Sequence, residues 1–470
     1  MDLAAPTEAL SSENSPIDTR VLHSCSLELA HDLLGIATAL PEQYPYLLDS
    51  AAPGPLGHYN LLLRTSGEQL CLHSNDNISG PGEGDGFLSR LSDWFQEKKQ
   101  SSNSISSWPF TGGWFLYLGY ELAKEIEPTI NFPSAPNEFP VAFACRCPAV
   151  IYACPKQPGT LHLVAETPAL LNEMRNEITN LRSVPQVEYT ALMDLQVDSP
   201  QLFKHAVEQI HEYILDGDVF QVNLSRGWRG EFAAAVDYDA LYQSLRKNNP
   251  APFAGMVRWK DYVLMSSSPE RLVHIYQDQV QSRPIAGTRP RGSDQNSDRA
   301  LSRELLAHPK ERAEHIMLID LERNDLGRVC QTGSIEVDEL MVVETYEHVH
   351  HIVSNVRGRL RSEVTPVDVI RAVFPGGTIT GCPKVRCMEI IAELEQQGRG
   401  FYTGSFGYLG LDGSMDLNIL IRSMLLHGRQ ISFRTGAGIV ADSDPDGEVA
   451  ETEDKARGLL KALAPAHGDP

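Results

Sequence analysis

The sequence predicts a mixed α/β protein, and three observations support this fold class. Short apolar runs bounded by Gly and Pro, such as 59–64 and 149–153, predict strands along much of the chain. Longer segments with apolar residues at helical spacing, such as 200–215, lie among them. The chain of 470 residues also exceeds the roughly 250–300 residues at which a single core stops growing. We therefore expect sheets covered by helices, in two lobes or in one large interleaved domain.

The first half of the chain has two predicted parts. Residues 1–20 are rich in Ser, Glu, Pro and Ala, which predicts a disordered N-terminal tail without the apolar core of a secretory signal. Residues 21–190 are expected to form a first region of short strands, interrupted by polar loops at 79–85 and 100–107. A helix is expected at 170–181, and the Ser-Val-Pro sequence that follows it suggests that this region ends near 190.

The second region, 198–465, has longer and more regular elements. Ser199 as the N-cap and Pro200 in the first turn predict a helix that ends at Leu215. Strands are expected at 219–224, 253–258, 262–265, 272–276, 280–283, 404–411, 417–426 and 430–437. Further helices are expected at 298–326, 367–374, 383–394 and 448–463. Most residues that carry chemistry lie in this region, so we take it as the catalytic domain.

The composition narrows the choice of partners. A formal net charge of −22 and a pI near 5.1 argue against nucleic acid and against an anionic membrane surface, because both select basic patches. An anionic substrate would need a locally positive pocket or a metal ion. The eight cysteines are dispersed, which is typical of reduced thiols in a cytoplasmic protein. No apolar run reaches the roughly 18 residues of a membrane span.

Two acidic helices and two glycine-rich turns are the first chemical candidates. The helices at 311–325 and 448–455 have the charge pattern of a solvated face, but carboxylates from two helices could also hold one Mg²⁺. The turn at 374–384 runs into a helix and could attract an anion, although it lacks the Lys and Ser/Thr of a P-loop. The turn at 435–440 either approaches a ligand or allows tight strand packing.

A short histidine run supplies a third candidate. His348 and His350 share one face of a predicted strand, and His351 takes the other. Each is either a core histidine or a functional one. The segment Pro284–Gly292 is a fourth candidate, because its glycines, threonine and arginines could cradle a small anion while Ala286 offers no reactive group.

Five segments together resemble the chorismate-utilising enzymes, the family of anthranilate synthase large subunits, aminodeoxychorismate synthase component I and isochorismate synthases. These segments are 268–271, 284–292, 311–325, 374–384 and 436–440. The resemblance covers 199–463 closely and the first half loosely. It implies a large α/β fold in which two mixed or antiparallel β-sheets pack together and are flanked by helices.

The resemblance also implies roles for individual residues. Glu270 matches the residue that protonates the departing 4-hydroxyl, and His351 matches an active-site histidine that orients the substrate or relays a proton. Glu314 and Glu451, supported by Glu448, match ligands of a Mg²⁺ that holds the ring carboxylate of chorismate. The implied substrate contacts are Gly287, Thr288, Tyr408, Arg422, Gly436, Ala437, Gly438 and Lys455.

The choice of reaction depends on a few positions. Anthranilate synthases usually carry alanine at the position of Ala286, whereas many aminodeoxychorismate synthases have a lysine nucleophile there. Two segments favour the second enzyme: Asn223 replaces a valine typical of anthranilate synthases, and Ala251–Phe253 replaces their Ser-Pro-Tyr. We therefore expect an aminodeoxychorismate synthase component I in which water or another group takes over from the lysine. Anthranilate synthase is the alternative, and an isochorismate synthase or a non-catalytic chorismate-binding subunit is less favoured.

Two further expectations follow from the resemblance. Leu48 and Ser50, with Pro252 and Phe253, match a tryptophan pocket, although a strand end packed on the core would have the same pattern. The chain has no segment that resembles a glutamine-hydrolysing domain, so a separate glutaminase subunit would supply ammonia. A downstream aminodeoxychorismate lyase would then convert the product to 4-aminobenzoate for folate biosynthesis.

Overall fold

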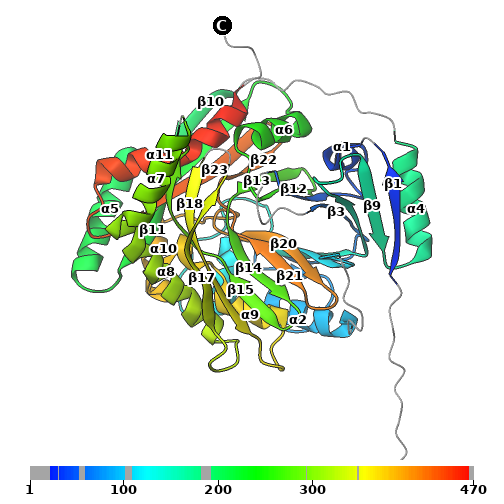
Figure 1. The fold of residues 1–470 in the computed structure, drawn as a ribbon, viewed down its shortest axis with the longest axis horizontal. Helices are drawn as coiled ribbons and strands as arrows, with labels where there is room; N and C mark the ends of the chain where they lie inside the picture. Colours follow the sequence, from blue (N-terminus) through cyan, green and yellow to red (C-terminus); the bar gives the residue numbers. More distant parts are fainter. Residues whose placement is uncertain are drawn as a thin grey trace, which may run out of the picture.

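Two antiparallel β-sheets form the centre of the molecule (Figure 1). The computed structural model describes residues 22–29, 31–51, 59–100, 108–181, 192–292, 294–346 and 349–464. The first sheet contains, in spatial order, β1 (His23–Glu28), β9 (Thr160–Ala165), β8 (Ala149–Ala153), β3 (Asn60–Arg64), β2 (Tyr46–Asp49), β12 (Phe253–Trp259), β13 (Tyr262–Ser268), β22 (Ser423–His427), β23 (Gln430–Ile439), β11 (Gln221–Phe232) and β10 (Leu192–Val197), and β19 (Gly381–Cys382) pairs with β11.

The second sheet is also antiparallel and also combines strands from both halves of the chain. Its spatial order is β16 (Ile285–Pro290), β18 (Val349–Arg359), β15 (Gln279–Ser282), β14 (Arg271–Tyr276), β21 (Met415–Asn418), β20 (Ser405–Gly410), β6 (Gly113–Leu118), β7 (Ala142–Cys147), β4 (Gln69–Leu72) and β5 (Ile78–Ser79), and β17 (Glu336–Thr345) pairs with β18. Strands from both predicted regions pair within each sheet, as β2 does with β12 and β6 with β20. The tail at 1–20 and most of the expected boundary near 190 lie outside the described residues.

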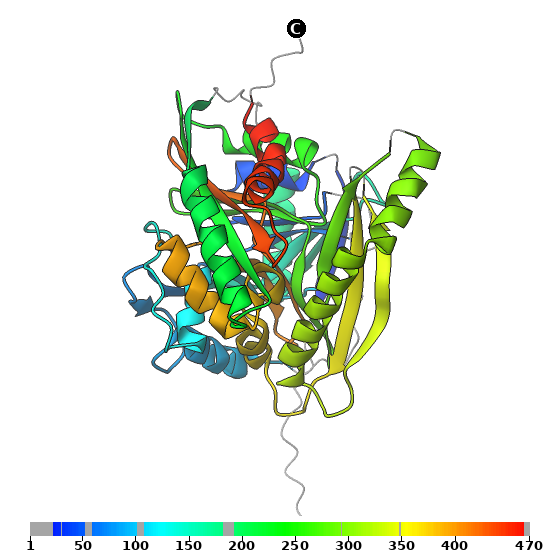
Figure 2. The ribbon, with the colours of Figure 1, turned by 90° about the vertical axis from the view of Figure 1, so that its left-hand side faces the viewer.

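Helices cover the outer faces of both sheets. They are α1 (Leu33–Ala39), α2 (Phe87–Lys98), α3 (Ala123–Ile126), α4 (Pro168–Thr179), α5 (Pro200–Leu215), α6 (Tyr238–Asn248), α7 (Gln295–Ala307), α8 (Pro309–Gly327), α9 (Pro366–Val373), α10 (Lys384–Glu395) and α11 (Pro445–Leu463). Figure 2 shows α5 and α11 side by side, and α7 and α8 along another edge. The prediction of two packed sheets flanked by helices is confirmed. Within the described ranges, no helix is long and apolar enough to cross a membrane.

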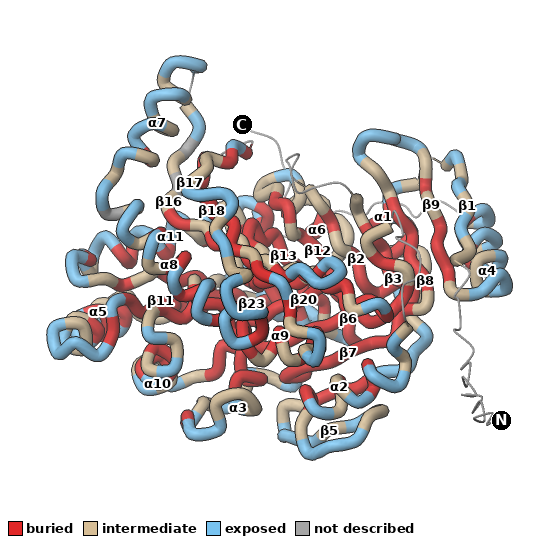
Figure 3. The backbone as a smooth tube through the Cα atoms, turned by 60° about the horizontal axis from the view of Figure 1, so that its bottom comes forward, coloured by how far each residue is buried: buried red, intermediate tan, exposed pale blue. Residues whose placement is uncertain are grey.

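Aromatic side chains fill the space between the two sheets. Tyr46 of the first sheet stacks on Phe115 of the second, with ring centroids 4.1 Å apart, and Phe143 stacks on Trp259 at 4.2 Å. Figure 3 shows the buried residues running through the strands and the exposed residues on the outer helices and loops. Stacked aromatic pairs bury large areas, so this layer holds the sheets at a defined distance and angle.

Two predicted elements are wrong, and each is divided in the structure. The helix expected at 298–326 is two helices, because Pro309 cannot donate a backbone hydrogen bond and its ring keeps His308 extended, with φ −69° and ψ 116°. The strand expected at 417–426 is β21 and β22, which belong to different sheets. Arg422 at their junction has a φ of 50°, so the chain turns there and cannot continue as one strand.

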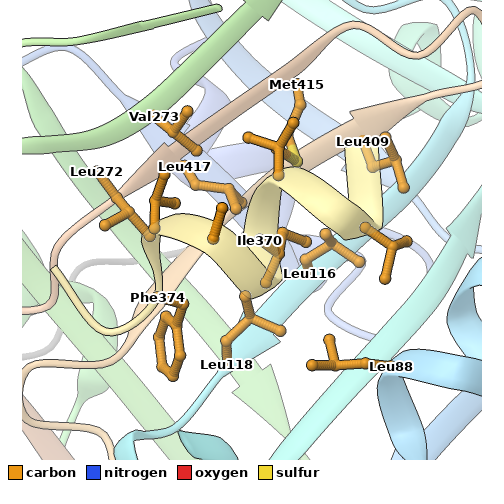
Figure 4. Close-up of a cluster of buried hydrophobic side chains, with 14 of the residues drawn as sticks. Leu88, Leu116, Leu118, Leu272, Val273, Ile370, Phe374, Leu409, Met415 and Leu417 are labelled. Carbon is orange, nitrogen blue, oxygen red and sulfur yellow. The ribbon is translucent and has the colours of Figure 1, made fainter. Parts of the chain in front are cut away.

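The helix α9 provides a test of the packing on the second sheet. Ile370 is fully buried among Leu116, Leu118 and Leu417 in a cluster between α9 and the sheet (Figure 4). We expect Ile370→Ala to lower the free energy of unfolding by about 2–5 kcal/mol, because it removes buried methyl groups and leaves a cavity. Equilibrium urea unfolding measures this change. Leu202→Ala, at a position that is 72% exposed, is the matched control and should change stability by less than about 0.5 kcal/mol.

Candidate active site

Two adjacent crossovers between the sheets position Glu270 and Arg422. The chain leaves β13 at Ser268 and enters β14 at Arg271, and it leaves β21 at Asn418 and enters β22 at Ser423. The crossovers are hydrogen-bonded to each other: the Ser268 hydroxyl donates to the Ile419 carbonyl at 2.5 Å, and the Ile419 amide donates to the Glu270 carbonyl at 3.0 Å. The Ser267 amide donates to the Arg422 carbonyl at 3.1 Å.

Glu270 is a buried carboxyl with the properties of an acid. It is 6% exposed, and its Oε1 atom has no hydrogen-bond partner among the described residues. Burial raises the pKa of Glu270 to about 7, and the nearby carboxyl of Glu322 adds to the rise. Burial also lowers the pKa of Arg422, an effect that the negative charge of Glu270 opposes. Glu270 therefore retains a proton near neutral pH that it can donate.

The strand β16 lies beside β18 and brings Ala286 and Gly287 close to His351. Ile352 pairs with Ala286 and His351 with Thr288, so Gly287 is the extra residue of a β-bulge. Gly287 has a φ of 69°, and a Cβ atom there would lie 2.6 Å from Glu311 Oε2. The Ala286 methyl is buried, whereas the side chain of Thr288 falls outside the part of the chain that the structure describes.

His351 is held neutral. Its side chain is buried, at 2% exposure, and this burial lowers its pKa to about 3. The positive charge of Arg422 lowers the pKa further. His350 points to the other face of β18, where its Nε2 lies 2.8 Å from Asp298 Oδ1. The opposite faces predicted for these two histidines are therefore confirmed, and His348 lies outside the described residues. A neutral imidazole can orient a ligand or accept a proton, but it supplies no fixed positive charge.

The glycines of β23 leave room for other side chains. A Cβ atom on Gly436 would lie 2.6 Å from the Tyr402 hydroxyl, and one on Gly438 would lie 2.3 Å from Gln221 Nε2. Lys455 Nζ donates to the Gly436 carbonyl at 2.9 Å and lies 2.7 Å from Glu451 Oε1. Gly436 and Lys455 are thus brought together. Ala437, by contrast, is fully buried in an apolar cluster with residues of α5 and α10.

Tyr408 lies in the aromatic layer between the sheets, whereas Tyr402 lies beside Gly436. Tyr408 is 6% exposed and belongs to the aromatic layer between the sheets, where its ring packs edge-on against Phe110 with centroids 5.3 Å apart. Tyr402 was missed in the sequence, although it lies in the glycine-rich segment 400–404 that precedes β20. Its hydroxyl position beside Gly436 depends on the pairing of segments far apart in the chain, which periodicity does not reveal.

The predicted metal ligands lie on two helices. Glu314 belongs to α8, and Glu448 and Glu451 lie one turn apart on α11. Glu448 is 9% exposed, whereas the side chain of Glu451 is 49% exposed. No group of three or more His, Cys, Asp or Glu within the described ranges is arranged to hold a metal ion. The donor chemistry nonetheless fits Mg²⁺, which takes one or two protein carboxylates, keeps several waters and completes its coordination with the substrate.

A buried ion cluster lies next to the glycine strand. The Glu395 carboxylate forms salt bridges with Arg399 at 2.7 Å and with Arg434 at 3.1 Å. It also accepts a hydrogen bond from the Ser225 amide at 2.9 Å. Burial alone would raise the pKa of Glu395, but the two arginines hold it below its usual value. A pocket of about 440 Å³ shares Arg399 and Arg434 with this cluster, and none of the predicted site residues lines it. We therefore place the candidate site at Glu270, Arg422 and His351 rather than at this pocket.

The residues of the predicted tryptophan pocket also come together. β2 and β12 pair, with Leu48 opposite Gly255, which brings Ser50 near Pro252 and Phe253. The Ser50 hydroxyl is buried and has no hydrogen-bond partner within the described residues. The Arg271 guanidinium lies 4.9 Å from the centroid of the Phe253 ring. Binding of tryptophan there stays a prediction.

Comparisons with known proteins identify the relatives of this chain. The profile of a family described as chorismate binding enzyme matches residues 59–461. An anthranilate synthase component I-like protein of Synechocystis sp. is 41% identical over 433 residues, which are 91% of this chain and 87% of that protein. Aminodeoxychorismate synthase component 1 of Bacillus subtilis is 50% identical over 261 residues, which are 56% of this chain and 55% of that protein.

A solved structure agrees with these sequence matches. The crystal structure of anthranilate synthase component I from Streptococcus pneumoniae superposes with a TM-score of 0.74 at 30% sequence identity. The superposition covers 85% of this chain and 92% of that one. The similarity therefore includes both sheets rather than the second region alone.

The ion cluster gives a stability test. We expect Glu395→Gln to lower the free energy of unfolding by about 3–5 kcal/mol, because it leaves the charges of Arg399 and Arg434 buried without a counter-charge. Urea unfolding at pH 7 measures the change. Glu393→Gln, at an exposed position on the same helix, is the control and should change stability by less than about 0.5 kcal/mol. Equal stability of the two variants would show that the cluster contributes nothing.

Proposed function

This chain belongs to the family of chorismate binding enzymes, and we propose that within it the protein is an aminodeoxychorismate synthase component I, a transaminase-type transferase. It would convert chorismate and ammonia to 4-amino-4-deoxychorismate and water. The observation that carries this proposal is the position of Asn223. Its Oδ1 atom is buried, has no hydrogen-bond partner among the described residues, and lies 3.0 Å from where a Cβ on Gly436 would be.

An amide at this position changes what the site can recognise. Valine, which anthranilate synthases typically have here, presents only methyl groups, whereas Asn223 presents an acceptor beside the glycine strand. A buried acceptor without a partner costs free energy unless a ligand satisfies it. An N–H group of ammonia or a hydroxyl of chorismate would do so. The similarity to the B. subtilis aminodeoxychorismate synthase component 1 supports the same choice.

Binding of the substrate would rely on local positive charge. Chorismate carries two carboxylates. The charges of Arg422 and Lys455 interact with Glu270, and Lys455 also donates a hydrogen bond to the Gly436 carbonyl. The overall charge of −22 disfavours anions elsewhere on the surface, so these two groups would provide most of the attraction. Gly287 and Gly436 would allow the backbone to approach the ring closely.

A magnesium ion would complete the binding site. Glu314 and Glu451, supported by Glu448, would hold Mg²⁺, and the bound ion would neutralise the ring carboxylate of chorismate. The remaining steps would use the side chains of the chain itself. Glu270 would donate its proton to the 4-hydroxyl as the C4–O bond breaks, so that the oxygen leaves as water. His351, which is neutral, would orient the substrate without adding charge.

Ala286 has a consequence for the path of the reaction. The buried methyl cannot attack the ring, so no covalent bond to this position would form. Water or another small nucleophile would therefore add at C2 as the C4–O bond breaks, and it would leave C2 again when ammonia adds at C4. Direct addition of ammonia at C2 would instead lead to anthranilate. Ala286 and the match to an anthranilate synthase component I-like protein favour this second candidate, anthranilate synthase.

The proposal includes two other proteins and a location. A separate glutaminase subunit would release ammonia, and an aminodeoxychorismate lyase would convert the product to 4-aminobenzoate. All eight cysteines are free thiols, which supports a cytoplasmic location.

A product assay distinguishes the two candidates. Purified protein with chorismate, Mg²⁺ and ammonium should give 4-aminobenzoate only after the lyase is added, because the lyase is needed to remove pyruvate. Liquid chromatography with fluorescence detection separates 4-aminobenzoate from anthranilate. Anthranilate as the main product without the lyase would overturn the proposal in favour of anthranilate synthase. Reactions without protein or without Mg²⁺ are the controls.

Glu270→Gln tests the proposed acid. We expect kcat to fall by about 100–10,000-fold, because the amide cannot donate a proton to the leaving hydroxyl. The activity of the unchanged protein should decrease as the pH rises through about 7, where Glu270 loses its proton. Glu304→Gln, at an exposed position, is the control, and its activity should have the same pH profile as that of the unchanged protein.

Glu270→Gln should also change how the stability of the protein depends on pH. The pKa of Glu270 is raised on folding, so its contribution to stability is full below the unfolded pKa of about 4.3 and is lost as the pH rises through about 7. Glu270→Gln removes this dependence. It should therefore gain stability relative to the unchanged protein as the pH rises from about 4.3 to about 7, and the difference should then stay constant, as measured by thermal unfolding from pH 4 to pH 9. A parallel loss of stability at every pH would contradict the assignment of a buried neutral carboxyl.

A further inference from the structure

The first sheet carries a pocket that the proposed reaction does not use. Its volume of about 440 Å³ is within the range of small-molecule sites. Ser432 of β23 pairs with Leu425 of β22, and Leu425 belongs to the aromatic layer between the sheets. Opposite residues of paired strands point to the same face, so Ser432 and Arg434 also point toward the second sheet. The pocket therefore opens on the inner face of the first sheet, and none of the predicted site residues lines it.

The inner end of this pocket holds more positive than negative charge. Arg399 and Arg434 line it, and both form salt bridges with the same carboxylate, that of Glu395. All three side chains are buried, with exposed fractions of 1%, 8% and 2%. Two guanidinium groups and one carboxylate leave one positive charge in excess. Because the groups are buried, water and salt screen this charge poorly.

Other acids near the pocket do not cancel this charge. Glu121 accepts a hydrogen bond from the Arg399 amide at 2.7 Å. Burial raises the pKa of Glu121 to about 7, so its carboxyl is only partly ionised near neutral pH. At the rim, Glu231 is paired with Arg429 at 2.7 Å, and Asp194 is exposed to solvent. The excess positive charge therefore stays at the inner end.

Two hydrogen-bond donors face the pocket without a protein acceptor. Arg434 Nε donates to the Ser225 hydroxyl at 3.0 Å and Nη2 donates to Glu395 at 3.1 Å, but Nη1 has no hydrogen-bond partner among the described residues. The hydroxyl of Ser432, which also lines the pocket, has no partner within the described ranges either. Arg399, by contrast, directs all three of its nitrogens to protein acceptors. An N–H group and a hydroxyl on one face can receive a carboxylate.

Aromatic rings line another part of the pocket. Tyr262 of β13 and His427 of β22 stack with centroids 4.1 Å apart, at an angle of 13°. Phe401 is a further lining residue. His427 pairs with Gln430, which lies four residues before Arg434 on β23, a distance of about 14 Å along the strand. A ligand that reaches from the guanidinium toward these rings needs a charged group on a flat, apolar body.

The second guanidinium is not needed to stabilise Glu395. Arg399 already provides a counter-charge, and a buried charge in excess costs free energy unless an anion compensates it. We propose that this pocket binds a small aromatic carboxylate, with the carboxylate on Arg434 Nη1 and the Ser432 hydroxyl and the ring toward Tyr262 and His427. This binding site is separate from the candidate active site and does not depend on which product the enzyme forms.

Isothermal titration calorimetry of the full chain with benzoate tests the proposal. The unchanged protein should bind benzoate with a Kd below about 1 mM. Arg434→Gln should weaken this binding by at least about tenfold, because it removes the charge that faces the pocket. The variant should still fold, since Glu395 stays paired with Arg399. Arg457→Gln, at a side chain that is 65% exposed, is the matched control and should change the Kd by less than about twofold.

Two other ligands test the chemical class. Benzamide has the shape of benzoate without its charge, and acetate has the charge without the ring. Each should bind at least about tenfold more weakly than benzoate, because one loses the salt bridge and the other loses the aromatic contact. Equal affinity for benzoate and benzamide would overturn the role of the charge, and equal affinity for benzoate and acetate would overturn the aromatic class.

A further variant separates this pocket from the candidate active site, where Arg422 could also attract benzoate. The binding that is lost in Arg434→Gln should persist in Arg422→Gln, with a Kd within about twofold of the unchanged value. If Arg434→Gln does not fold, as judged by thermal unfolding, Ser432→Leu takes its place, because it fills the pocket and leaves the ion cluster intact. Unchanged benzoate binding in the pocket variant, or loss of all benzoate binding in Arg422→Gln, would overturn the proposal.

Discussion

The hydrogen bonds between the crossover at Ser268–Glu270 and the crossover at Ile419–Arg422 are the interactions on which the site depends. They hold together the two places where the chain passes from one sheet to the other. The acid and the cation of the site lie at these crossovers, so their separation is set by backbone geometry rather than by flexible side chains. The aromatic layer between the sheets, with Tyr46 on Phe115, keeps the crossovers in register. Placing functional groups on such a rigid frame limits the conformational entropy lost when a ligand binds.

Burial is the second physical factor that shapes this site. The same low-polarity surroundings raise the pKa of Glu270 and lower the pKa of His351. At a pH near 7 His351 is therefore neutral and Glu270 still holds its proton in part, and the proposed reaction would divide the acid and orienting roles between them. Because the net charge of the chain is −22, the positive charge of Arg422 would matter all the more for attracting an anionic substrate.

The glycine strand shows how a small change can alter specificity. Gly436 and Gly438 have no side chains, and the Tyr402 hydroxyl and the Gln221 amide occupy the space that side chains would need. Asn223 contributes to the same surface from the neighbouring strand, opposite Gly438. The choice between amination at C2 and at C4 would then depend on polar atoms at two or three positions. The relatives of this chain carry both kinds of name, anthranilate synthase component I-like protein and aminodeoxychorismate synthase component 1.

The sequence by itself determined much of the local structure and supplied the candidate site residues. Alternating and helical spacing predicted several strands of each sheet, the N-terminus of α5 and the opposite faces of His350 and His351, because these features depend on neighbours along the chain. Tertiary structure alone decided which of these residues meet. The division of 417–426 between two sheets and the position of Tyr402 beside Gly436 both arise from contacts between distant segments. Residue spacing carries no information about such contacts, because they are selected by the packing of the whole core.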